Sequence, residues 1–114
     1  MTSAGTMRYA ILLTQGAEHE LDSIVGYLST ADGAVNAHRV LAALMETIAQ
    51  LEHYPDRGSH PSEPLSLGIK EFRQVFFKPY RVIYRIIEQT VTIVIIADGR
   101  RDFQSLLARR LLRA

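Results

Sequence analysis

The hydrophobic period of this chain changes once, near Ile69, and that change constrains the fold more than any other feature. Before it, apolar residues recur at the three- and four-residue spacing of amphipathic helices. After it come three runs rich in β-branched and aromatic residues, as is typical of strands: Glu71–Phe77, Tyr80–Ile87 and Val91–Ala97. The sequence therefore predicts helices followed by a meander of strands, which is an α+β arrangement.

The helical half is predicted to be a hairpin preceded by a short strand. Arg8–Leu13 predicts the strand, and Thr14 supplies a side chain that can cap the helix after it. The first helix carries one apolar stripe, made of Ala17, Leu21, Ile24, Val25 and Leu28. Ser29–Gly33 interrupts this pattern, and Pro55 forbids continuation of the second helix. The stripe of that second helix consists of Ala37, Val40, Leu41, Leu44, Ile48 and Leu51.

The second half is predicted to be an antiparallel meander closed by a helix. Its connections, Lys78–Pro79 and Glu88–Thr90, are short enough for antiparallel strands. The last strand is apolar on both faces, so we expect it in the centre of the sheet. Asp102 can cap a final helix, whose apolar stripe is Phe103, Leu106, Leu107 and Leu111. The predicted order is β-α-α-β-β-β-α, with a disordered leader at 1–6, a loop at Tyr54–Leu67 and a single domain over 7–114.

Charge is divided unequally between the two halves of the chain. Residues 1–69 hold three basic against eight acidic residues, a net charge of −5, whereas residues 70–114 hold ten against four, a net charge of +6. This asymmetry indicates an anionic partner for the C-terminal half, either a nucleic acid or an acidic polypeptide, although a scatter of solvated arginines is the simpler alternative.

Several classes of function are excluded or disfavoured by composition. The chain has no cysteine, so disulfides and thiolate metal sites are excluded. No apolar run approaches the roughly 20 residues of a membrane helix, and the N-terminus lacks the order of a signal peptide. His53, His60 and Glu63 have no recognised metal-ligand spacing, so we expect no metal site and no cofactor. A cytoplasmic protein is the expectation.

Two motifs in the basic half resemble those of a known family. Tyr80–Ile86 forms a Tyr-Arg strand, and Ile95–Asp102 ends the next strand in a small-Gly-Arg-Arg-Asp turn, with Leu67–Glu71 as a Leu-Gly-containing lead-in. This ordered set, together with the strand-helix-helix opening, resembles the ParE/RelE toxin superfamily of type II toxin–antitoxin systems. The resemblance extends over nearly the whole chain from Met7 onward.

The resemblance implies one of two mechanisms. RelE-like members are ribosome-dependent endonucleases of messenger RNA, whereas ParE-like members poison DNA gyrase. The RelE pattern would place Arg73, Arg81 and Arg101 at phosphate-stabilising positions. RelE-like enzymes carry a tyrosine or histidine for proton transfer on the C-terminal helix, and here Leu107 matches that position.

Two further observations favour the ParE-like function. All four histidines lie in the acidic half: His19, His38, His53 and His60. By the two-residue period of a strand, Tyr80 and Tyr84 face away from Arg81 and Arg85. A non-enzymatic gyrase inhibitor is therefore preferred to a ribosome-dependent endonuclease, and a plain nucleic-acid-binding module is the third candidate.

The resemblance and the charge pattern together nominate site residues. For target binding we expect Arg81, Arg100 and Arg101; Arg81 could instead pair with Glu71, and Asp98 and Asp102 could merely neutralise and cap. For antitoxin binding we expect the last helix, through Arg109, Arg110, Arg113, Leu106 and Leu107. The implied partner is a short DNA-binding antitoxin with an acidic tail that is disordered when free, in a possible toxin–antitoxin hetero-oligomer.

Overall fold

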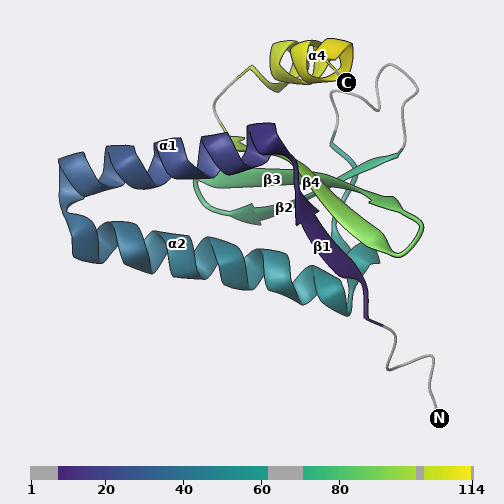
Figure 1. The fold of residues 1–114 in the computed structure, drawn as a ribbon, viewed down its shortest axis with the longest axis horizontal. Coiled ribbons are helices and arrows are strands. Elements are labelled where there is room, and N and C mark those ends of the chain that lie inside the picture. Colours follow the sequence, from purple (N-terminus) through teal and green to yellow (C-terminus); the bar gives the residue numbers. More distant parts are fainter. Residues whose placement is uncertain (1–7, 62–70, 100–101, 114) are drawn as a thin grey trace.

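The computed structural model describes residues 8–61, 71–99 and 102–113, the last of these with side chains as far as Arg110. The order of helices and strands in these parts is the predicted β-α-α-β-β-β-α (Figure 1). The leader at 1–6 and the part of the predicted loop at 62–67 lie outside the described residues. The remainder of that loop includes a short 3₁₀ turn, η3 (Pro55–Arg57).

The strands form one mixed sheet with the order β1-β4-β3-β2. β2 (Phe72–Phe77), β3 (Tyr80–Ile87) and β4 (Thr90–Asp98) make the predicted antiparallel meander. β1 (Ala10–Leu13) pairs in parallel with β4, from Ala10 opposite Thr90 to Leu13 opposite Ile93. The central position of the doubly apolar strand is thus confirmed, since β4 lies between β1 and β3.

The helical hairpin consists of α1 (Gln15–Asp32) and α2 (Ala34–Ala49), which lie side by side in Figure 1. Thr14 caps α1 as predicted, because its hydroxyl accepts the Ala17 N–H at 3.1 Å. The α2 helix ends in a 3₁₀ turn, η2 (Gln50–Glu52), before Pro55.

The predicted interruption at Ser29–Gly33 was too wide, because α1 continues through Asp32 and only Gly33 breaks the helix. Gly33 has φ +92° and ψ 161°, a conformation open essentially to glycine alone. The polar residues before it remain helical; the Thr30 hydroxyl, for example, donates back to the Gly26 carbonyl.

Apolar side chains cover both faces of the sheet. The hairpin covers one face, and the core there includes Leu44, Ile48, Val82, Tyr84 and Ile96. On the opposite face lies α4 (Phe103–Arg113), which buries Phe103, Leu106 and Leu107 against Phe72, Ile83, Ile95 and Ala97. The predicted stripe of the last helix is confirmed at these three residues, and the side chain of Leu111 lies outside the described part.

Candidate binding site on the α4 face of the sheet

Arg81 lies on the sheet face that α4 covers. Its Nε and Nη2 donate to Gln74 Oε1 at 3.1 and 2.7 Å, and its Cζ lies 3.9 Å from the centre of the Phe103 ring. A guanidinium above an aromatic ring gains a cation–π attraction. Glu71, the alternative partner expected for Arg81, accepts from Arg85 Nη1 at 2.5 Å.

Arg73 points to the opposite face of the sheet. In the antiparallel register Arg73 is paired with Tyr84, whereas Arg81 is paired with Phe76, and directly paired residues share a face. The Arg73 Nη1 donates to the carbonyls of Asp56 and Gly58, at 3.2 and 3.0 Å. The sheet therefore separates two of the three arginines that the RelE pattern would bring together on one phosphate; Arg100 and Arg101 lie outside the described residues.

Tyr84 orders the same turn from within the core. It is fully buried, its hydroxyl donates to the Pro55 carbonyl at 2.7 Å, and the hydroxyl oxygen accepts the Gly58 N–H at 3.2 Å. Burial raises the pKa of Tyr84 above its ordinary value of 10.0, outweighing the Gly58 hydrogen bond and the Arg73 charge, which lower it. Tyr84 is thus a neutral structural anchor, on the face away from Arg81 as the strand period predicted.

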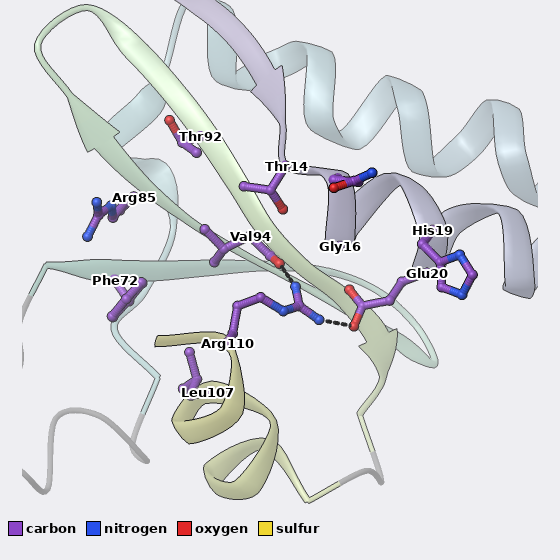
Figure 2. A pocket seen from close by; sticks show the side chains of 11 residues that line it. Thr14, Gly16, His19, Glu20, Phe72, Arg85, Thr92, Val94, Leu107 and Arg110 are labelled. Carbon is purple, nitrogen blue, oxygen red and sulfur yellow. Dashed lines mark hydrogen bonds and ion pairs between the residues drawn. The ribbon is translucent and has the colours of Figure 1, made fainter. Parts of the chain in front are cut away.

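A cavity of about 720 Å³ opens between the start of α1, the sheet and α4 (Figure 2). Arg110 of α4 crosses it to Glu20 of α1, where Nη2 and Oε2 are 2.6 Å apart. Arg110 Nη1 also donates to the Val94 carbonyl, and Glu20 Oε1 accepts the Ile96 N–H at 3.0 Å. Neither Glu20 nor Gly16, which also lines the cavity, was singled out from the sequence, because neither belongs to a local motif.

The structure separates the predicted antitoxin-binding residues of α4 into two groups. Arg109 is exposed, whereas Leu106 and Leu107 are 7% and 5% exposed in contact with the sheet, and Arg110 is engaged with Glu20. The side chain of Arg113 lies outside the described part. The predicted helix cap is confirmed, since Asp102 accepts the Ser105 N–H at 3.1 Å, and this bond and that of the Ser105 hydroxyl lower the pKa of Asp102.

Two described side chains bear on proton-transfer chemistry at this face. Leu107 is buried, and His19 lines the cavity at the start of α1. Within the described ranges, no three His, Asp or Glu side chains are grouped as a metal site would need. None of the helices there has the length and apolar character that crossing a bilayer requires.

The fold and this face define a small α+β domain that carries arginine and aromatic side chains on a sheet and its covering helix. The chain belongs to the ParE toxin family of type II toxin–antitoxin systems, parDE, whose model matches residues 11–103. No curated protein shows significant sequence similarity to it.

Solved structures share the fold. A chain of the chromosomal ParDE toxin–antitoxin system from P. aeruginosa superposes with a TM-score of 0.68 at 16% identity, covering 82% of this chain and 98% of its own length. A chain of the RelBE2 toxin–antitoxin complex from Mycobacterium tuberculosis gives 0.60 at 23% identity, covering 82% and 93%. Similarity to these two structures establishes the fold. It does not distinguish between the two mechanisms.

Proposed function

We propose that this ParE-family toxin acts by binding DNA gyrase and is neutralised by a cognate antitoxin. The observation that carries the choice of target is the separation of Arg73 from Arg81 by the sheet. Cleavage of RNA by attack of its own 2′-OH needs cations converging on one phosphate and a group that moves the proton. The described part of the α4 face holds Arg81 without Arg73. Leu107, which the RelE resemblance places at the proton-transfer position, is buried.

Binding by surface complementarity needs neither of those features. Arginine and aromatic side chains are enriched among the residues that dominate protein–protein affinity. Arg81 is held in place by Gln74 and by the Phe103 ring, so it loses little conformational freedom on binding. We assign target binding to Arg81 and to Arg100 and Arg101, which follow β4 in the sequence.

The test is expression of the toxin without an antitoxin, with two readouts. We expect growth arrest with a DNA-damage response while messenger RNA stays intact, and inhibition of supercoiling when purified toxin is added to gyrase. Codon-dependent cleavage of ribosome-bound messages would contradict the gyrase assignment and favour an endonuclease.

Arg101→Ala tests the assigned surface. If Arg101 acts only by contacting the target, the substitution should abolish toxicity while the thermal midpoint stays almost unchanged. An insoluble Arg101→Ala protein would show that Arg101 is structural. Arg73→Ala provides the contrast, since gyrase inhibition should survive it in protein that remains folded, whereas an RNA-cleaving site would need Arg73.

The cognate antitoxin is proposed to bind the basic half of the domain. The P. aeruginosa and M. tuberculosis neighbours are toxin–antitoxin systems, and residues 70–114 of this chain carry the net charge of +6 that would attract an acidic segment. On the part of α4 whose side chains are described, Arg109 is exposed. Antitoxin contacts to Leu106, Leu107 or Arg110 would require α4 to leave the sheet, because those side chains are engaged within the domain.

A further inference from the structure

The central strand β4 is longer than the edge strand beside it. β1 pairs with β4 only as far as Ile93, whose carbonyl accepts the Thr14 N–H at 3.0 Å before the chain turns into α1. Beyond that point the Val94 carbonyl accepts from the Arg110 side chain, and the Ile96 N–H donates to Glu20. Two side chains thus pair backbone groups of β4 where its pairing with β1 has ended, one of them at the register shift between β3 and β4.

Glu20 and Arg110 form one connected unit, which we call the clamp. Their side chains are 18% and 23% exposed, so solvent screens their attraction less than that of a surface pair. The clamp joins α1, β4 and α4, and Figure 2 shows Arg110 reaching from α4 to both partners.

Gly16 makes room for the clamp at the start of α1. A Cβ added there would lie 2.8 Å from both Cζ and Nη1 of Arg110, whereas a Cβ added at Gly26, in the same helix, would meet nothing within 4 Å. Replacing Gly16 with alanine would therefore push the guanidinium away without altering either charge of the pair.

The other end of α4 carries Phe103, the ring beneath Arg81. α4 thus runs from the clamp, near its C-terminal end, to the arginine assigned to target binding. A helix of three turns moves nearly as a rigid body. Loosening the Arg110 end of α4 therefore also displaces Phe103, the residue that supports Arg81.

We propose that Glu20 and Arg110 are positioning residues, which hold α4 on the sheet and thereby keep Arg81 in the geometry that the toxin presents to its target. This inference rests on the proposed function for its last step, since Arg81 is assigned there to target binding. The clamp itself requires only the contacts described above. A role confined to overall stability would make a different prediction, because it would lower the thermal midpoint without selectively mobilising α4.

The experiment compares Gly16→Ala with Gly26→Ala, both single glycine-to-alanine changes that favour the same helix. Hydrogen exchange is measured over α4 and over the hairpin, and potency is measured by gyrase supercoiling with purified toxin. For Gly16→Ala we expect α4 amides to exchange about tenfold faster or more, the scale for losing a charge-assisted hydrogen bond, together with a measurable loss of potency. Exchange of the hairpin amides should rise less than exchange of the α4 amides. Gly26→Ala should change neither α4 exchange nor potency.

A second variant is needed because the Arg110 side chain could shift to accommodate the added methyl group and still pair with Glu20. Glu20→Gln keeps an oxygen for the Ile96 N–H but removes the charge that holds Arg110, so it should reproduce the faster α4 exchange. Unchanged α4 exchange in both Gly16→Ala and Glu20→Gln would overturn the clamp. Faster exchange at full potency would overturn the link to Arg81. Wild-type toxin that leaves gyrase unaffected, with α4 exchange responding as expected, would instead contradict the proposed function and leave the clamp supported.

Discussion

Replacing Tyr84 with phenylalanine removes one oxygen atom from a fully buried ring and leaves the packing of that ring intact. Two hydrogen bonds disappear, one to the Pro55 carbonyl at 2.7 Å and one from the Gly58 N–H at 3.2 Å. Pro55 and Gly58 are both buried, so water cannot readily replace the lost partner.

The expected cost follows from the number of groups left unpaired. Each buried polar group without a partner costs about 1–3 kcal/mol, and relaxation of the turn recovers part of this, so we expect about 2–3 kcal/mol in total. For a domain of this size that loss lowers the thermal midpoint by roughly 8–12 °C. Since small domains are stable by about 5–15 kcal/mol, the variant should still fold.

The assay is thermal and urea unfolding of the purified domain, followed by far-ultraviolet circular dichroism because the chain has no tryptophan. Tyr54→Phe is the matched control, since Tyr54 is 68% exposed and its replacement should change the free energy of unfolding by less than about 0.5 kcal/mol. If Tyr84→Phe unfolds at the same temperature as the wild type, the two hydrogen bonds do not stabilise the turn and the reasoning is refuted.

Three further predictions concern the same core and turns. Burial raises the pKa of Tyr84 in the folded state above 10.0, so its contribution to stability is present below that pH and is lost as the pH rises through the raised value. Urea titrations should show that the free energy of unfolding falls more steeply at alkaline pH in the wild type than in Tyr84→Phe. Parallel curves for the two proteins would refute this. Gly33→Ala should destabilise by about 1–3 kcal/mol, because alanine is strained at φ +92°, and an unchanged urea midpoint would contradict that conformation. Gly58→Ala should lower the free energy of unfolding by an amount on the order of 1–3 kcal/mol, because the added Cβ would lie 2.6 Å from the backbone oxygen of Gln74. A urea midpoint as high as that of the wild type would show that the turn can accommodate the methyl group.

The sheet face on which Arg81 lies was accessible to strand-period reasoning. The period correctly placed Tyr80 and Tyr84 on the face away from Arg81. The two-residue connection at Lys78–Pro79 also implies the observed pairing of Phe77 with Tyr80, and counting back along β2 from that pair places Arg73 on the opposite face. The separation of the two arginines could therefore have been predicted by extending the period across the turn.

The contacts that α4 makes within the domain could not be predicted from the sequence in the same way. Arg110 was predicted to face a partner because it lies in a basic helix, yet it is engaged with Glu20 and the Val94 carbonyl. Glu20 had no local signal, since it is one of several acidic residues on a helix with an exposed face. The partners are 90 positions apart in the sequence, so only the packing of α4 beside α1 brings them together.

Within the described residues, the sequence by itself determined the order and type of the α-helices and strands, because hydrophobic period, the Thr14 and Asp102 caps and the Pro55 stop act over a few neighbouring residues. It also determined that β4 is central, since a strand apolar on both faces must be covered on both. Only the tertiary structure decided that β1 pairs in parallel with β4 and stops at Ile93, leaving backbone groups that Glu20 and Arg110 satisfy. Such contacts depend on how elements that are distant in the sequence pack together. The hydrophobic pattern along a single helix or strand contains no information about that packing.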